Sequence, residues 1–165
     1  MKKIVITSIS LFFILSIIAL VVIYNKSTTP LEEKQTMAIA RAQEAAELVS
    51  IDHVDWFHYQ DAYMIVEGTD QDGKDLIVWV PEDKEKDMII KEKKEGLSRE
   101  EVLSIMQYGL PDLSQGSRPR EILRIKYGMV ENTPVYEVTY IDQHNRYSIL
   151  YLDFYEGEWY RVFNL

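Results

Sequence analysis

Hydrophobic and polar positions along the chain change their spacing several times, and each change predicts a different element. Residues 4–24, IVITSISLFFILSIIALVVIY, carry no charge over 21 positions. A helix of that length spans about 30 Å, which matches the core of a bilayer, so we expect a transmembrane helix here. A cleaved signal peptide is the alternative. Its apolar stretch is shorter and ends in small residues, whereas this segment ends in the bulky Val21, Val22 and Ile23.

A second helix is predicted directly after this segment. Thr29 and Glu32 form a Thr-x-x-Glu capping box, with Pro30 at the first helical position. The small apolar residues that follow at helical spacing are Ala38, Ala42, Ala45 and Val49. They form one face that can lie close against a sheet.

The spacing then changes from helical to extended. Aromatic and β-branched residues dominate three runs, VDWFHYQ, AYMIVEGT and DLIVWVP, and we expect three strands that end at Pro81. The segment 82–96 mixes both charge signs around a small apolar centre, Met88 to Ile90. It is expected to be a solvated connector with one short strand, because interleaved acids weaken the alternative of a basic recognition patch.

The clearest local signal predicts a helix from residue 98. Ser98 and Glu101 form a capping box, and Leu97 and Val102 occupy the two positions of a hydrophobic staple. The tripeptide GLP at 109–111 ends this helix. Four extended runs follow it, EILRIKYGMV, PVYEVTYI, YSILYLDF and WYRVF. A helix followed by antiparallel strands is therefore expected twice.

Two turns share one chemistry. DQDGK at 70–74 and DQHNR at 142–146 lie 72 positions apart, and the flanking apolar positions align at the same offset. Asp-Gly between apolar runs predicts a hairpin in which Gly73 has positive φ, and Asn145 occupies the matching position. A calcium-binding EF-hand loop is excluded, because such a loop needs glycine at its sixth position, whereas Gly73 is the fourth residue counted from Asp70.

The predicted fold class is α+β, with two tandem modules that each pack a helix on an antiparallel sheet. Modules of this size bury little surface alone, so the two are expected to share an interface. The predicted ranges are 1–26 for the cytoplasmic N-terminus and transmembrane helix, 27–93 for the first module and 94–165 for the second.

Charge and cysteine content narrow the partners and the compartment. The chain has 18 basic and 27 acidic residues; three of the lysines fall within residues 1–26, which leaves 15 basic residues against 27 acids, a balance of −12. A body this acidic repels nucleic acid and anionic lipid. Lys2 and Lys3 precede the apolar segment and only Lys26 follows closely, so we expect a cytoplasmic N-terminus and an extracytoplasmic body. The absence of cysteine excludes disulfides and thiolate metal sites.

No constellation in the sequence predicts catalysis. His53, His58 and His144 do not converge, and the sequence lacks the serine-nucleophile and phosphate-loop motifs. The carboxylates that lie near one another in sequence are Glu137, Asp142, Asp153, Glu156 and Glu158. Such proximity is expected by chance in so acidic a chain. We therefore assign no catalytic, cofactor-binding or metal-ligating residue, expect no small-molecule substrate, and do not expect an enzyme.

The aromatic residues supply the candidates for partner binding. Eleven tyrosines and three tryptophans concentrate in the predicted strands, where cross-strand packing is their ordinary role. As a set they can also furnish a protein-binding face. The candidate partner-binding residues are Tyr136, Tyr147 and Tyr151 in the second module.

Several segments together resemble the TseB-like cell wall elongation regulators of Gram-positive bacteria. They are the N-terminal anchor, YMIVEGTDQDGKDLIVWVP from Tyr63, KEGLSREEVLSI from Lys94 and YEVTYIDQHNRYSILYLDFYEGEW from Tyr136. The resemblance implies a single-pass membrane protein with cystatin-like, PepSY-like modules outside the membrane. It also implies a noncatalytic regulator that acts with an elongation-type penicillin-binding protein. PepSY modules are associated with restraining peptidases as well, so an inhibitor or binder of an envelope peptidase is the alternative.

Overall fold

The computed structural model describes residues 2–110 and 112–164, without the side chains of 2–12, 19 and 21–30. It divides into two units, 1–37 and 38–165. Helix α1, Lys2–Ala46, makes up the first unit and continues into the second. The predicted helix start at Thr29 is wrong, because α1 runs through this position without a break.

The predicted transmembrane segment falls mostly on side chains outside the description. Of residues 4–24, the structure describes the side chains of 13–18 and 20. Among the residues that it describes, no helix is both long and apolar enough to cross a bilayer.

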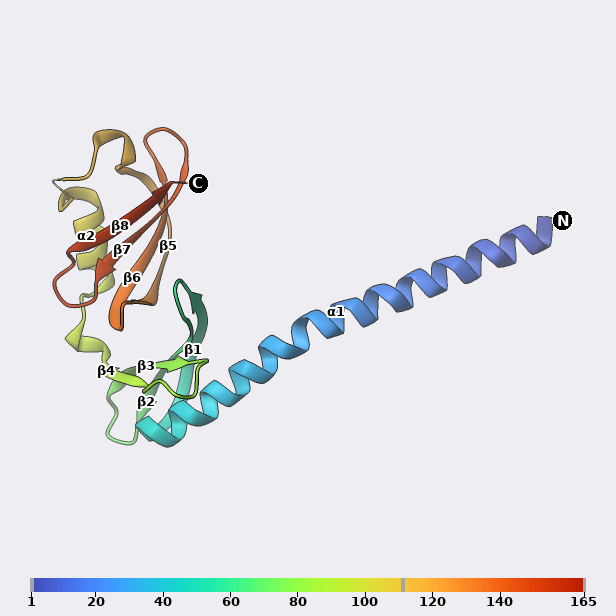
Figure 1. Ribbon diagram of the computed structural model, residues 1–165, viewed down its shortest axis with the longest axis horizontal. Helices are drawn as coiled ribbons and strands as arrows, with labels where there is room; N and C mark the ends of the chain where they lie inside the picture. Colours follow the sequence, from blue (N-terminus) through green and yellow to red (C-terminus); the bar gives the residue numbers. More distant parts are fainter. Residues whose placement is uncertain (1, 111, 165) are drawn as a thin grey trace. The chain divides into compact units, whose positions relative to one another are not determined.

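The second unit contains two four-stranded antiparallel sheets (Figure 1). The first sheet has the order β1-β2-β3-β4, and its strands are β1 Leu48–His58, β2 Ala62–Asp70, β3 Asp75–Pro81 and β4 Ile89–Glu92. The three strands predicted up to Pro81 are confirmed, as is the short strand inside the charged connector. The first sheet is buried on both faces, which explains why β3 reads as one apolar run instead of alternating with polar residues.

The end of α1 covers one face of the first sheet. Ala38, Ala42 and Ala46 are buried there against a cluster that includes Val66 and Val78. The predicted small-residue face is thus confirmed for Ala38 and Ala42. It is wrong for Ala45, which is exposed.

The prediction is also wrong for Val49, whose side chain is 61% exposed. The helix ends at Ala46, Glu47 takes a positive φ of 51°, and the chain is extended from Leu48 onward. A helical pattern read across this boundary therefore assigns Val49 to a face that no longer exists.

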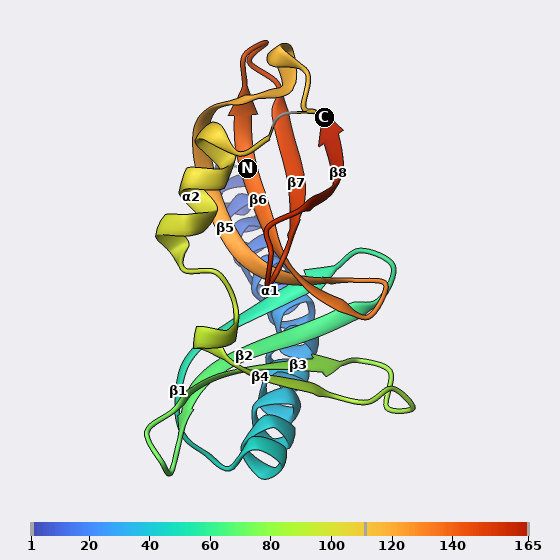
Figure 2. The same cartoon turned by 90° about the vertical axis from the view of Figure 1, so that its left-hand side faces the viewer.

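The second sheet has the order β5-β6-β7-β8. Its strands are β5 Pro119–Val130, β6 Thr133–Asp142, β7 Tyr147–Asp153 and β8 Trp159–Asn164, and the helical segments before it are η1 Lys93–Glu95, α2 Arg99–Tyr108 and η2 Gln115–Ser117. Figure 2 shows α2 along one side of this sheet. The α+β class with two antiparallel sheets is confirmed, and the predicted module boundary falls in η1.

Helix α2 begins as its sequence predicts. The hydroxyl of Ser98 accepts a hydrogen bond from the backbone N–H of Glu101 at 3.2 Å, and the Glu101 carboxylate accepts one from the Ser98 N–H at 2.7 Å. Val102 and Met106 are buried on the side that faces the second sheet. Gly109 caps the C-terminal end, while Pro111 lies outside the described residues.

The two hairpins are copies of each other, as predicted. Gly73 has φ 78° and Asn145 has φ 62°. Asp70 Oδ1 accepts backbone N–H groups of residues 72 and 74, both at 2.9 Å, and Asp142 Oδ1 accepts those of 144 and 146 at 2.8 and 2.9 Å. The doubled Asp-Gln motif therefore marks two equivalent turns.

The repeat extends beyond the hairpins into features that the sequence does not reveal. Strand β1 has two register shifts, at 48/50 and 51/53, and β5 has two at 119/121 and 122/124, which is the same pattern at an offset of 71. Bulges of this kind bend a strand and increase its twist. The first strand pairs of the two sheets thus share their register shifts as well as their order.

The inner faces of both sheets form one hydrophobic core. Phe57, Ile65 and Trp79 of the first sheet pack in the same cluster as Tyr136 and Leu150 of the second. The shared interface that the small size of the modules predicts is therefore present within the second unit.

Candidate functional site

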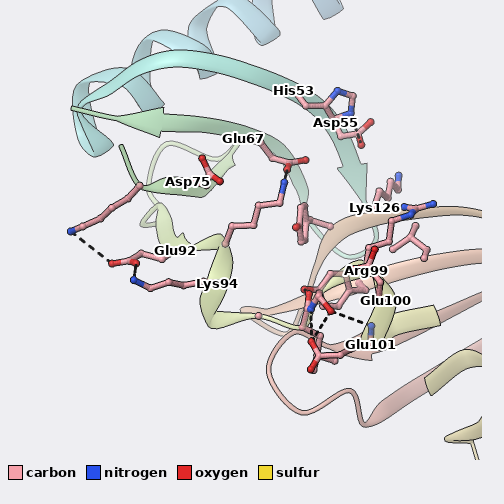
Figure 3. Close-up of a pocket in the computed structure, with 18 of the residues that line it drawn as sticks. His53, Asp55, Glu67, Asp75, Glu92, Lys94, Arg99, Glu100, Glu101 and Lys126 are labelled. Atoms are coloured by element: carbon pink, nitrogen blue, oxygen red, sulfur yellow. Dashed lines mark hydrogen bonds and ion pairs between the residues drawn. The ribbon is translucent and has the colours of Figure 1, made fainter. Parts of the chain in front are cut away.

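A cleft of about 910 Å³ lies between the first sheet, the segment from β4 to the start of α2 and the second half of β5 (Figure 3). Its lining is mostly ionic. The carboxylates come from Asp55, Glu67, Asp75, Glu92, Glu100 and Glu101, and the cationic side chains from Lys74, Lys93, Lys94, Arg99 and Lys126. The cleft therefore carries both charge signs in its lining.

Ion pairs join the walls of the cleft. Lys93 Nζ lies 2.8 Å from Glu67 Oε2. The Glu92 carboxylate pairs with two lysines, with Lys94 Nζ 2.5 Å from Oε2 and Lys74 Nζ 3.9 Å from Oε1. Lys94 is 78% exposed, so solvent screens its pair with Glu92 and the pair contributes little to folding. Pairs this weak can exchange for the charges of a bound partner at little cost.

The pKa shifts of Glu92, Lys93 and Glu101 in the cleft all favour the charged forms of these side chains. A hydrogen bond from Lys94 holds the pKa of Glu92 below its ordinary value, and one to Glu67 raises the pKa of Lys93. Hydrogen bonds from the backbone and hydroxyl of Ser98 lower the pKa of Glu101. These directions are typical of structural ion pairs, whereas a general acid needs a raised carboxyl pKa near neutrality.

Lys126 connects the two sheets at the cleft. Its Nζ lies 3.0 Å from Glu137 Oε1, donates to the carbonyl oxygen of Trp56 at 3.4 Å and lies 5.6 Å from the centroid of the Phe57 ring. Glu137 Oε2 in turn accepts the hydroxyl of Tyr151 at 3.0 Å. The network spans β5, β6 and β7 and reaches β1.

The structure separates the three candidate tyrosines. Tyr136 and Tyr151 are buried, with 3% and 4% of their surfaces exposed, while Tyr147 is 46% exposed. The Tyr136 hydroxyl donates to Leu97 O at 2.5 Å. Cross-strand packing thus accounts for the burial of Tyr136 and Tyr151, and the small exposed part of Tyr136 lines the cleft. Tyr147 is the one candidate tyrosine whose side chain is widely exposed.

The remaining candidate groups do not meet. His53 lines the cleft and pairs with Asp55 at 3.2 Å, His58 stacks on Trp56, and His144 lies in the turn between β6 and β7. Among the described residues, no three His, Asp or Glu side chains form a group suited to a metal ion. Every buried polar side-chain atom described there has a hydrogen-bond partner.

Sequence reasoning missed this cleft. Lys93, Glu67 and Lys126 are far apart in sequence, and only the inter-sheet packing brings their side chains to one cavity. The available signal was the density of charge in residues 82–96, which we interpreted as a solvated connector. Its C-terminal part, from Glu92 to Gly96, forms one wall of the cleft.

Fold and site together define a class: an α+β protein with two repeated four-stranded antiparallel sheets and an ion-paired cleft between them. A family model described as "Cell wall elongation regulator TseB-like domain" matches residues 37–81. The chain is 35% identical over 136 residues to "Probable cell wall elongation regulator TseB" of Bacillus subtilis (strain 168), covering 82% of this chain and 80% of that protein. The chain therefore belongs to the TseB-like family of cell wall elongation regulators.

A solved structure has the same fold. The "YpmB protein from Bacillus subtilis" superposes with a TM-score of 0.71 at 30% identity, over 79% of this chain and 97% of that one. The matched share corresponds to nearly the whole length of that structure.

Proposed function

We propose that this protein is a noncatalytic, membrane-anchored regulator of cell wall elongation that binds an extracytoplasmic penicillin-binding protein. The observation that carries the regulatory role is the 35% identity to a protein named as a probable cell wall elongation regulator. The partner follows from the family resemblance of the sequence.

The ion-paired cleft is the surface proposed for this contact. Lys94 and Arg99 are exposed at it, and Glu100 adds an exposed carboxylate beside them. A surface with both signs suits a polar partner segment of complementary charge, and such complementarity sets specificity and association rate more than affinity. The acidic body around the cleft disfavours polyanionic partners.

A direct binding measurement tests this surface. Full-length protein in non-ionic detergent is titrated with a purified elongation-type penicillin-binding protein, and the double variant Lys94→Glu/Arg99→Glu is expected to bind at least about tenfold more weakly. Lys84→Glu, an exposed reversal away from the cleft, is the matched control. Equal binding by both variants would remove the cleft from the proposal.

The proposed membrane anchor is inferred from the uncharged segment 4–24 and from Lys2 and Lys3 before it. It places the protein in the cell membrane with a single span, the N-terminus in the cytoplasm and the body outside. The chain has no cysteine, so a membrane-impermeant maleimide should label Asp72→Cys on intact cells and leave the natural protein unlabelled. Labelling only after lysis would contradict this orientation.

A peptidase inhibitor or binder is the second candidate. Strands β4 and β8 are edges that pair with one neighbour each within the described sheets, and an edge strand can accept an extended peptide. On this account the purified full chain should slow an envelope peptidase at stoichiometric concentration. The absence of slowing across a panel of such peptidases would leave the regulator as the single proposal.

A further inference from the structure

A smaller concavity, of about 490 Å³, lies where the η2 segment meets the turn between β6 and β7. Figure 2 shows these two loops side by side at the top of the second sheet. The side chains or backbone that line it belong to Gln115, Gly116, Arg118, Gln143 and His144. None of them is acidic, although the chain has 27 acids, so this lining differs from that of the main cleft, where carboxylates and cations are mixed.

Hydrogen bonds to the backbone fix this concavity. Tyr140 donates its hydroxyl to Ser117 O at 2.9 Å, and the Gln143 amide donates to Pro119 O at 3.2 Å. The half-buried Arg118 donates from Nη2 to Leu110 O at 3.2 Å. A guanidinium has five N–H donors in a rigid plane, and this bond uses one while it orients the others.

Gly116 permits the closest contact in the site. A Cβ atom at this position would lie 2.2 Å from His144 Nε2, a distance that real Cβ atoms do not reach. The imidazole can therefore lie against the backbone of residue 116 only while that residue is glycine. His144 and Arg118 both line this one cavity.

The one carboxylate of this turn is already neutralised. Asp142 has no exposed side-chain surface, and its Oδ2 accepts Arg146 Nε at 2.7 Å. Its Oδ1 accepts the backbone N–H groups of His144 and Arg146. The Asp142 charge therefore points inward, and Arg120, bonded to the Asn145 side chain, adds a further positive charge to the outer surface.

We propose that this concavity binds an oxyanionic group, a phosphate or a carboxylate carried by a small organic molecule. Arg118 can supply charge-assisted hydrogen bonds, and the side chains of His144, Gln115 and Gln143 can supply further N–H donors around the same concavity. The volume exceeds what the anionic group alone fills, which leaves room for the moiety that carries it. This site is separate from the cleft of the proposed function and does not depend on it.

NMR titration of the full-length ¹⁵N-labelled protein in maltoside micelles tests the proposal. The probes are glycerol 1-phosphate, inorganic phosphate and acetate, with matched sodium chloride as the ionic-strength control. Saturable shifts confined to the amides of Gly116, Gln143 and His144 support the site, and the preference between phosphate and acetate identifies the anion. Shifts that never saturate, or that sodium chloride reproduces, would overturn it.

Variants separate a site from general charge attraction. Arg118→Gln is expected to weaken binding at least about tenfold, and Gly116→Ala should weaken it by displacing His144. Arg99→Gln removes one arginine from the main cleft and should bind as the natural protein does. If Arg118→Gln disturbs the fold, Arg118→Lys keeps the charge without the planar fork and should still lose affinity. Equal binding by the Arg118 and Arg99 variants would contradict the proposal.

Discussion

Trp79 donates a hydrogen bond of 2.8 Å from its indole Nε1 to the backbone carbonyl oxygen of Gly128. The tryptophan belongs to β3 of the first sheet and the glycine to β5 of the second, and the indole ring has no exposed surface. Its ring also packs edge-on against Phe154 and Tyr127. One side chain thus joins the two sheets by a polar bond and by apolar contacts, which makes residues 38–165 a single compact unit.

Replacing this tryptophan should destabilise the whole unit. Trp79→Phe removes the hydrogen bond and leaves a cavity, and we expect a loss of about 2–4 kcal/mol in the free energy of unfolding, measured with urea. Trp56→Phe is the matched control. The Trp56 indole donates to the Glu82 carboxylate at 3.0 Å, and Trp56 is 47% exposed, so that variant should lose under about 1 kcal/mol. Equal losses would show that Trp79 does not hold the sheets together.

The Lys126–Glu137 pair should behave as a buried one. The two side chains are only 14% and 11% exposed, so Lys126→Met leaves a desolvated carboxylate and should cost about 2–4 kcal/mol. The double variant Lys126→Met/Glu137→Gln removes both charges and should recover part of that loss. A double-mutant cycle in urea measures the coupling. Simple additivity of the two single variants would contradict a buried pair.

Stability should fall in alkaline solution. Burial raises the pKa of Tyr127, and also of Tyr140, from 10.0 to about 12. The unfolded chain therefore loses these phenol protons first, and between pH 10 and about 12 each group lowers the free energy of unfolding by at most about 1.4 kcal/mol per pH unit. Burial raises the pKa of Tyr136 and Tyr151 as well, which extends the decline.

Urea unfolding at a series of pH values measures this slope. Tyr127→Phe removes one of the contributing phenols, so its stability should decline less steeply above pH 10 than that of the natural protein, with stability at pH 8 as the baseline of each. Identical slopes would show that the Tyr127 phenol is not protected by burial.

The repeated turns provide a pair of opposite substitutions. A Cβ at Gly73 meets no atom within 4 Å, so Gly73→Ala should destabilise through backbone strain alone, by about 1–2 kcal/mol at a φ of 78°. Asn145→Gly at the equivalent position should cost nothing or stabilise slightly, although it removes the contact with Arg120. Thermal unfolding distinguishes them, and a neutral Gly73→Ala would contradict the equivalence of the two turns.

Local chemistry explains which parts of the fold could be predicted. The Ser98 capping box and the positive φ at Gly73 and Asn145 depend on residues within one turn, so their patterns predict them correctly. The end of α1 depends on Glu47, which has no strong local signal for a positive φ. The helical pattern in the sequence therefore continues past the end of the helix, to Val49.

Contacts between distant segments explain what could not be predicted. The apolar pattern places Tyr136 and Tyr151 in strands but cannot say that residues of α2 and of the first sheet pack with them in one core. That packing buries two of the three candidate tyrosines. The cleft likewise depends on the pairing of Lys93 with Glu67 across 26 positions.

The most direct test of the central claim is photocrosslinking in living cells. A photoreactive amino acid is placed singly at Lys94 and Arg99 in the cleft, at the exposed Tyr147, and at Lys84 as the control outside the cleft. The account predicts an adduct with an elongation-type penicillin-binding protein from Lys94 or Arg99 that is clearly stronger than from Lys84. No such adduct above background from any of the four positions would contradict it.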